Sequence, residues 1–376
     1  MRLIATLSKY ISRVTRLSLF IASAQIGLAA DEAALLSFAL QDRIQDVYES
    51  FHSSIVRIKA TKQNSNDEQQ SVSRVLKMGT GFIVSKDGHV LTSGLLQEPE
   101  RIWIEHDKSF YLAELLGNDS MCNLSLLKIV DANREFSFVS LVDQVSDIKP
   151  GSFLIGLSCA LEFQVGPTYG LAQSREIAFG KNLFPTSMLR ASLPLGPGEV
   201  GAPVFDLQGR FVGMGHAALP DLSASFLLPA EACLRVRDGL LFSGAVDYGW
   251  FGVTVSRKLN LKNSFEIVVQ GTVDGSPASK SSLKVGDVIK KIAGEEVTNR
   301  GDLAHAAFFA KPGTVVEFVV FRDGKEVKVP IKVEKRRQVS LLSRSDVVEV
   351  DGVLPDDAND KNEGTVATDS NQSENF

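Results

Sequence analysis

The sequence is short of cysteine and tryptophan, and it has no concentration of positive charge. Its 376 residues include three cysteines and two tryptophans, and the formal net charge is −5. Cys122, Cys159 and Cys233 follow no metal-ligand spacing and lie in apolar neighbourhoods. We therefore expect buried free thiols and no metal or cofactor, with one disulfide as the alternative in an exported chain. Without a basic stripe, nucleic acid is not an expected partner.

A long hydrophobic run is also missing, although the first thirty residues differ from the rest. Residues 1–16 carry four basic side chains and no acid, and an apolar stretch follows that ends in small residues. This order is typical of a secretory signal peptide, here residues 1–30, cleaved after Ala29 or Ala30. The apolar stretch is too short for a good membrane span. We predict an exported protein of the periplasm or cell envelope with no stable membrane span after cleavage; a transit peptide and a retained anchor are the alternatives.

Periodicity and composition divide the remaining chain into four parts. Residues 31–50 have apolar side chains at helical spacing, which predicts an amphipathic helix. Residues 51–245 contain many short apolar or alternating runs separated by turns, which favours an all-β barrel or sandwich. Residues 246–336 combine strand patterns with two helical stretches, as in a compact α+β module. Residues 337–376 are rich in Asp, Asn, Ser and Glu, which predicts a disordered acidic tail.

Three motifs in the β-rich part carry a family resemblance. They are "GTGFIVSKDGHVLTSGLLQ" at residues 79–97, "GNDSMCNLSLLKIV" at residues 117–130 and "GPGEVGAPV" at residues 196–204. In this order, the chain resembles the HtrA/Deg family over roughly residues 45–336. That family consists of exported trypsin-like serine proteases with one or two C-terminal PDZ domains. The resemblance implies a mainly β protein, with a trypsin-like double β-barrel followed by an α+β PDZ domain.

The same resemblance locates the positions of a catalytic triad. The histidine, aspartate and serine positions of the family motifs are occupied by Leu95, Asn123 and Val200. Leucine and valine have no ionisable group, and asparagine cannot stabilise an imidazolium ion. Loss of the serine or the histidine alone typically costs about 10⁶ in turnover. The sequence therefore predicts that the chain is not an enzyme, with a degenerate triad and no catalytic residues.

The glycine-rich loop keeps its outline despite these changes. We expect the backbone N–H groups around Gly198 and Val200 to form an oxyanion-like loop. The cleft is then expected to hold peptides without cutting them, unless Leu95 and Val200 fill it as a dry patch. The alternative is a serine endopeptidase with a displaced active site, for which His216 is the histidine closest in sequence to the former nucleophile loop.

The C-terminal module resembles an HtrA-type PDZ domain. The resemblance rests on "YGWFGV" at residues 248–253, "GSPASKSSLKVGDVIKKIAGEEV" at residues 275–297 and the helical stretch that follows. Such domains add a peptide as an extra strand and capture its terminal carboxylate on loop N–H groups. The predicted peptide-binding residues are Trp250, Phe251, Gly252, Val253, Leu303, Ala306 and Ala307. For Phe251 and Leu303, a place in the core is an equal alternative.

The leading hypothesis is an exported HtrA-like pseudoprotease. It would bind peptides or unfolded protein C-termini through its PDZ domain without cleaving them, as a chaperone, an adaptor or a regulator of an active HtrA paralogue. An envelope scaffold protein is a further alternative. The resemblance also implies a homotrimer in which Tyr48 and Phe51 contribute contacts, with burial in the same subunit favoured for Phe51. Finally, the carboxylate of Phe376 is a candidate occupant of the PDZ groove, against the alternative of an inert tail.

Overall fold

The structure is a computed structural model, and it describes seven segments of the chain. These are residues 38–66, 71–93, 99–130, 134–142, 148–180, 182–260 and 263–336. The predicted signal peptide, the predicted acidic tail with Phe376, and Leu95 lie outside the described residues. Within the predicted N-terminal helix, residues 38–51 are helical. No helix in the described segments is long and apolar enough to cross a membrane.

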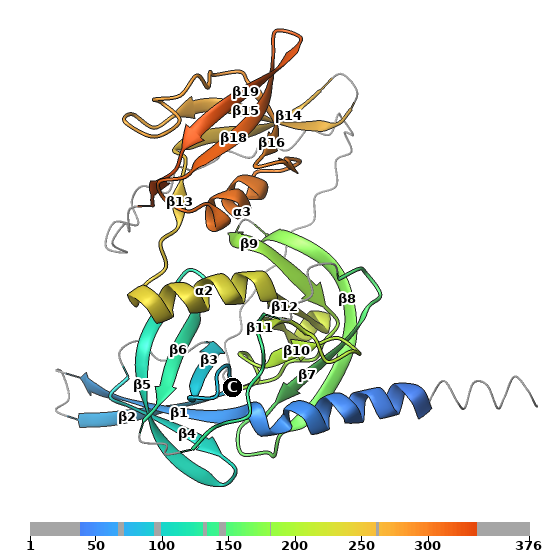
Figure 1. The fold of residues 1–376 in the computed structure, drawn as a ribbon, viewed down its shortest axis with the longest axis vertical. Coiled ribbons are helices and arrows are strands. Elements are labelled where there is room, and N and C mark those ends of the chain that lie inside the picture. Colours follow the sequence, from blue (N-terminus) through green and yellow to red (C-terminus); the bar gives the residue numbers. More distant parts are fainter. Residues whose placement is uncertain are drawn as a thin grey trace, which may run out of the picture. The chain divides into compact units, whose positions relative to one another are not determined.

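The first barrel consists of antiparallel strands that close on themselves (Figure 1). Around the barrel, the order is β1 (Ile55–Asn66), β2 (Ser71–Ile83), β3 (His89–Ser93), β6 (Leu124–Ile129), β5 (Ser109–Asp119) and β4 (Arg101–His106). A short 3₁₀ helix, η1 (His52–Ser54), precedes β1. Along β4 every second residue is buried, as expected for strands with one face toward a core. Ile58, Ile104 and Leu127 are among the residues that fill this core.

The second barrel repeats the same closed arrangement. Around it run β10 (Pro203–Phe205), β11 (Phe211–Leu219), β12 (Ala224–Pro229), β9 (Asn182–Ala191), β8 (Gly166–Phe179) and β7 (Phe153–Ser158), with η2 (Pro220–Leu222) between β11 and β12. The helix α2 (Ala230–Ser243) follows directly and ends at Gly244, which has a φ of 69°. Two closed barrels confirm the predicted trypsin-like double β-barrel.

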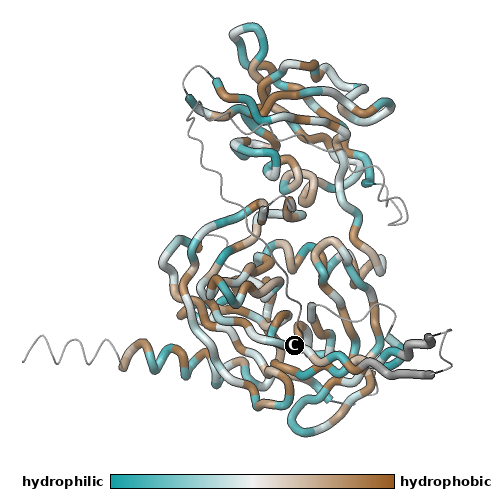
Figure 2. The backbone as a smooth tube through the Cα atoms, turned by 180° about the vertical axis from the view of Figure 1, so that it is seen from behind, coloured by the Kyte–Doolittle hydropathy of each residue, from teal (hydrophilic) through white to brown (hydrophobic). Residues whose placement is uncertain are grey.

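The C-terminal module is built on a five-stranded path. Its order is β14 (Val253–Leu259), β15 (Phe265–Thr272), β16 (Val288–Ile292), β18 (Val315–Arg322) and β19 (Lys325–Lys332), with β17 (Glu295–Glu296) paired to β16. The short strands β13 (Gly249–Trp250) and β20 (Glu334–Lys335) pair with each other, and α3 (Gly301–Phe309) completes the predicted α+β module. Apolar residues follow the strands of the module, and hydrophilic residues occupy its hairpin tips (Figure 2).

One large core spans both barrels. Phe82 of the first barrel lies 5.5 Å from Phe211 of the second, measured between ring centroids. The three cysteines are buried and free, as the sequence predicts. Burial raises the pKa of the Cys159 thiol, so at neutral pH this thiol is protonated and behaves as a small apolar group.

Candidate functional site

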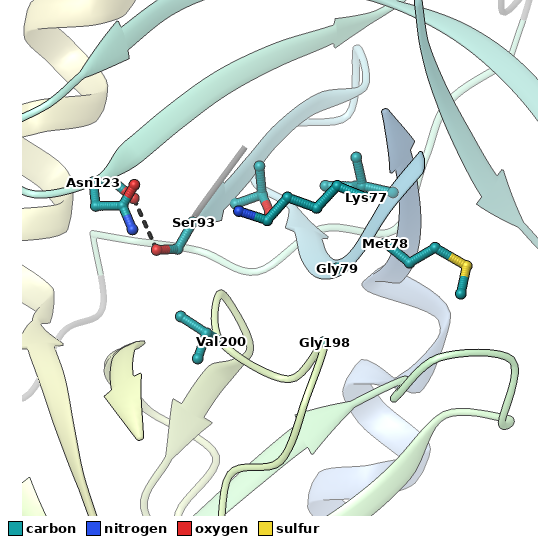
Figure 3. Close-up of a pocket in the computed structure, with 9 residues that line it drawn as sticks. Lys77, Met78, Gly79, Ser93, Asn123, Gly198 and Val200 are labelled. Carbon is teal, nitrogen blue, oxygen red and sulfur yellow. Dashed lines mark hydrogen bonds between the residues drawn. The ribbon is translucent and has the colours of Figure 1, made fainter. Parts of the chain in front are cut away.

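The cleft of the peptidase-like part is a cavity of about 300 Å³. Its lining residues are Ile58, Lys77, Met78, Gly79, Thr92, Ser93, Asn123, Gly198 and Val200. They come from the strands β1, β2 and β3, from the turn before β6, and from the glycine-rich loop (Figure 3). The structure therefore brings together two of the three predicted triad positions, Asn123 and Val200.

The glycine-rich loop keeps its glycines because it packs tightly against the first barrel. Gly201 has a φ of +101°, and a Cβ atom there would lie 2.5 Å from the carbonyl oxygen of Thr80. No other residue type fits this position without displacing β2. The carboxylate of Glu199 fixes the loop, since it accepts hydrogen bonds from the Ser158 hydroxyl at 2.6 Å and from the Gly196 N–H at 2.5 Å.

Asn123 sits at the end of a turn that buried hydrogen bonds hold in place. Its φ is +50°, in the left-handed region that asparagine tolerates better than most residues. The carboxylate of Asp119 accepts the Cys122 N–H at 2.7 Å and the Tyr248 hydroxyl at 2.9 Å. Burial raises the pKa of Asp119 above its ordinary value, although these hydrogen bonds oppose the shift. The turn presents the Asn123 carbonyl oxygen, which accepts the Ser93 hydroxyl at 2.8 Å.

Two residues of the loop that line the cleft, Gly198 and Val200, have backbone donors without a partner in the described segments. The carbonyl oxygen of Gly198 accepts both the N–H and the hydroxyl of Thr80, each at 2.8 Å. Within the described segments, the N–H groups of Gly198 and Val200 have no hydrogen-bond acceptor. These are the donors that the sequence assigns to the oxyanion-like loop, and they remain available to a ligand.

The hydroxyl groups of the cleft donate to carbonyl oxygens rather than to bases. Ser93 donates to Asn123, and Thr92 donates to the Thr80 carbonyl oxygen at 2.8 Å. A serine nucleophile needs a base within hydrogen-bond reach, often with looser geometry before substrate binds. His216 is not among the residues that line this pocket. Burial lowers the pKa of His216, and the nearby backbone of Cys122 opposes the shift.

One serine–histidine pair escaped the sequence reasoning. The Ser85 hydroxyl lies 2.7 Å from Nδ1 of His89, and the His89 N–H donates to the same oxygen at 3.2 Å. The pair closes the hairpin between β2 and β3. His89 begins β3, whereas Ser93 ends it, so the pair lies at the other end of this strand from Ser93. The four-residue spacing across a predicted hairpin is the signal that could have found it. Its geometry is that of a turn closed by a side chain.

The predicted peptide-binding residues surround the start of β14 and the helix α3. Gly252 has a φ of +72°, and a Cβ atom there would lie 2.2 Å from Cβ of Ser276. Phe251 is 4% exposed and packs edge-on against Phe318, with ring centroids 5.0 Å apart, so its side chain belongs to the core. Within the described segments, the N–H groups of Phe251 and Gly252 donate no hydrogen bond. Of the other predicted residues, Val253, Leu303, Ala306 and Ala307 are partly buried against the same core, and Trp250 pairs with Glu334 in β20.

The helix α3 also carries a half-buried histidine, His305. The Thr186 hydroxyl and the Ser187 N–H lie 2.7 Å and 3.3 Å from Nδ1 of His305. Because the Ser187 N–H can only donate, Nδ1 accepts and the neutral ring carries its proton on Nε2. Burial lowers the pKa of His305. This contact joins α3 to β9 and was not predicted from the sequence.

Comparisons with known proteins agree with this architecture. Residues 79–214 match the trypsin-like peptidase domain family, and residues 249–333 match the PDZ domain family. A probable periplasmic serine endoprotease DegP-like protein of Pseudomonas fluorescens is 29% identical over 290 residues, covering 72% of this chain and 60% of the relative. A protein of the same name from a Marinomonas species is 28% identical, covering 69% of this chain and 57% of the relative. The chain thus spans about three-fifths of the length of these relatives.

Solved structures show the same fold. The HtrA-type protease AlgW with a decapeptide superposes with a TM-score of 0.63 at 21% identity, covering 78% of this chain and 99% of that protein. A serine endoprotease from Yersinia pestis gives a TM-score of 0.55 at 19% identity, covering 78% of this chain and 98% of that protein. At these identities the likeness establishes the fold of the two domains.

The comparisons correct one prediction and confirm another. The prediction that the chain is not an enzyme is contradicted, because the relatives are named serine endoproteases and the solved neighbours are HtrA-type proteases. It rested on the three triad positions alone, and related chemistry is known to recur with other groups and orders of residues. The predicted exported location is confirmed by the relatives, which are named periplasmic.

Proposed function

We infer that this chain, which joins a trypsin-like peptidase domain to a PDZ domain as HtrA/DegP-type proteins do, captures polypeptides in the periplasm. The PDZ domain binds their C-termini, and the double barrel offers a second cleft for the polypeptide. The proposal is supported by the N–H groups of Phe251 and Gly252, which lack acceptors among the described residues and lie in the loop that matches the carboxylate-binding loop. A neighbour of the same fold was solved with a decapeptide.

Peptide binding to the full chain tests this function. A fluorescent peptide with a free hydrophobic C-terminus is expected to bind, and its amidated form is expected to bind at least about tenfold more weakly. The variant Gly252→Ala places a Cβ atom into Ser276 and is expected to abolish binding to the PDZ domain. Gly271→Ala is the matched control, since a Cβ atom at Gly271 meets nothing within 4 Å. Equal affinity for the acid and the amide would refute carboxylate capture.

The names of the relatives favour a second function, that of an endopeptidase with a displaced active site. Asn123 and Val200 occupy two triad positions in the described cleft, so another group would have to act as the nucleophile. Ser93 is the candidate that the structure offers, because its hydroxyl lines the cleft.

Digestion of unfolded casein by the full chain tests cleavage, with Ser93→Ala and Val200→Asp run alongside. Cleavage that disappears in both variants supports a displaced site in this cleft. Cleavage that is equal in all three preparations identifies a contaminating protease. If the native chain leaves casein intact, polypeptide capture stands as the function of the chain without this second activity.

The assembly of the chain stays a proposal. Phe51 stacks on Phe205 of the same chain at 4.4 Å between centroids, and the Tyr48 hydroxyl lies 3.5 Å from the Val165 carbonyl oxygen. Both side chains therefore have partners within one subunit. Light scattering tests for a homotrimer or for a complex with an active paralogue. The number of different peptides bound tests for a scaffold role. A clean monomer rules out the trimer, and recognition of one C-terminus only favours the scaffold.

A further inference from the structure

We propose that the cleft of the double barrel is a binding site for a polypeptide carboxylate, with Lys77 as its cationic partner. This rests on the proposed polypeptide capture and adds the chemical group that the cleft selects. Lys77 lies on β2, opposite Ala60 of β1, and its side chain is exposed. Figure 3 shows it extended along the pocket, with its amine directed toward the side formed by Ser93 and Asn123.

Like Lys108 in the hairpin between β4 and β5, Lys77 has no partner within the described segments, whereas Lys59 and Lys86 of the same barrel do. Lys59 pairs with Glu105 and Glu162, each at 3.3 Å, and Lys86 pairs with Glu135 at 3.3 Å. The ammonium group of Lys77 instead faces a cavity, where it is free to pair with a ligand.

Among the described residues that line the pocket, the side chains carry one positive charge and no negative charge. An acid occupies position 123 in the family motif, whereas Asn123 brings no charge to the pocket. The carboxylate of Glu199 is held by Ser158 and Gly196, and Glu199 is not among the lining residues. An anion in the pocket therefore meets no opposing carboxylate from this described part of the lining.

The opposite wall supplies hydrogen bonds that suit a carboxylate. Gly198 and Val200 line the pocket, and their N–H groups have no acceptor among the described residues. A carboxylate accepts up to about four hydrogen bonds through its two oxygens. It can therefore engage an ammonium group and two backbone donors together, as in other backbone nests that capture terminal carboxylates.

The remaining walls are apolar and leave room for the ligand. Ile58, Met78 and Val200 provide alkyl and thioether surface. Beside them, a Cβ atom added to Gly79 would meet nothing within 4 Å, so the space there is open. This combination suits either a C-terminal residue with an apolar side chain or an acidic side chain within a polypeptide. The carboxylate is common to both.

Methionine methyl NMR on the full chain reads this site directly. The chain has five methionines; Met78 lines the pocket, whereas Met188 and Met214 are fully buried in the core. The probes are Gly-Gly-Val-Leu with a free C-terminus, the same peptide as an amide, and Gly-Glu-Val-Leu as an amide. The free acid is expected to shift the Met78 signal saturably, with an affinity about fivefold higher than the first amide, while Met188 and Met214 stay in place. Restored binding by the glutamate amide assigns the carboxylate to a side chain, and continued weak binding assigns it to the C-terminus.

Two variants test the charge without changing the size of the pocket appreciably. Lys77→Gln is expected to weaken binding of the free acid about fivefold, and Asn123→Asp is expected to weaken it similarly by adding the opposing charge. Lys86→Gln is the control, since Lys86 forms its ion pair at the exposed hairpin between β2 and β3.

The proposal is overturned if no peptide shifts the Met78 signal, or if the free acid and both amides bind with equal affinity. So does unchanged binding in Lys77→Gln. The result is separable from PDZ binding, because Gly252→Ala removes the latter and is expected to leave the Met78 response intact. If Gly252→Ala leaves overall peptide affinity unchanged while the Met78 response is present, the proposed capture by the PDZ domain fails and this site stands.

Discussion

The Tyr248 hydroxyl donates a hydrogen bond of 2.9 Å to the carboxylate of Asp119, 129 positions earlier in the chain. Tyr248 precedes the first strand of the PDZ domain, and its ring also packs against Phe308 of α3 with centroids 5.1 Å apart. Asp119 holds the turn that presents Asn123 to the cleft. One buried contact therefore links the residue that precedes the PDZ domain to the turn that carries Asn123 in the peptidase cleft.

Removing this hydroxyl should destabilise the chain. Tyr248→Phe is expected to lower the free energy of unfolding by about 1.5–3 kcal/mol, because a buried carboxylate loses one of its donors. Urea unfolding followed by circular dichroism measures the change. Tyr111→Phe is the control, since the Tyr111 hydroxyl meets only an exposed Arg134 at 3.4 Å, and its cost should stay below about 0.5 kcal/mol. Equal losses in both variants would contradict the importance of the Tyr248 contact.

The loop glycine at position 201 should tolerate no side chain. Gly201→Ala is expected to cost more than the roughly 1–3 kcal/mol of backbone strain, because its Cβ atom would also lie 2.9 Å from the Ser93 N–H nitrogen. Thermal unfolding of this variant beside Gly166→Ala gives the comparison, since a Cβ atom at Gly166 meets nothing within 4 Å. A melting temperature for Gly201→Ala equal to that of Gly166→Ala would show that the loop can move away from β2.

Acid should weaken the PDZ domain through Asp287. This carboxylate is 1% exposed and accepts two hydrogen bonds of 2.6 Å from Arg322. Burial works to raise the pKa of Asp287, but the bonds and charge of Arg322 outweigh it and hold the pKa below its ordinary value. The stabilisation is therefore complete above the unfolded-state pKa of about 4 and is lost as the pH falls through the lower folded-state pKa.

Unfolding of the native chain and of Asp287→Asn between pH 6 and pH 2 checks this linkage. The difference in unfolding free energy should be constant from pH 6 to about pH 4 and shrink below it. A difference that is independent of pH throughout this range would mean that the carboxylate charge contributes nothing at this position.

The contact between α3 and β9 should also respond to acid, in a different range of pH. Since burial lowers the pKa of His305, the folded chain favours the neutral ring. Stability is then greatest above the unfolded-state pKa of about 6.5 and falls as the pH decreases toward the lower folded-state pKa. In the native chain, Nδ1 accepts from Ser187, and protonation puts a second donor against that N–H.

Imidazole NMR titration measures the pKa of His305 directly, and His305→Gln should remove the associated loss of stability between pH 7 and pH 5. His52→Gln serves as the control, because the His52 ring lies 3.0 Å from the Tyr48 carbonyl oxygen outside this contact. A His305 pKa at or above the ordinary value would contradict the effect of burial.

Local sequence determines much of this architecture. The motif at residues 79–97 predicts a strand, a turn and a second strand because of its glycines and its alternating apolar residues. The structure has the end of β2, a turn and β3 within these residues. Asn123 and Val200 meet in the cleft because each lies on a turn whose backbone is set by its own glycines or hydrogen bonds. Sequence patterns of this kind reflect the backbone conformation of short segments, and this is the part of the structure that they predicted correctly.

Contacts between distant segments could not be predicted in the same way. The place of Lys77 in the cleft depends on the register of β1 and β2, in which Ala60 lies opposite Lys77, and on the closure of the barrel. The pairing of His305 with Thr186 depends on the packing of α3 against β9. The prediction of an inactive chain failed for a related reason, because three positions do not determine which other groups a folded cleft brings together.

The core shared by Phe82 and Phe211 has a consequence for dissecting the protein. A cut between the two barrels would leave each half with half of an apolar core facing water and with unsatisfied backbone partners around Thr80 and Gly198. Neither half is expected to be soluble alone, whereas the two fragments mixed together should reassociate as complementary pieces of one molecule. The two barrels are therefore expected to fold only together. Genetic recombination could transfer the pair as one domain, but a recombination point between the barrels would disrupt folding.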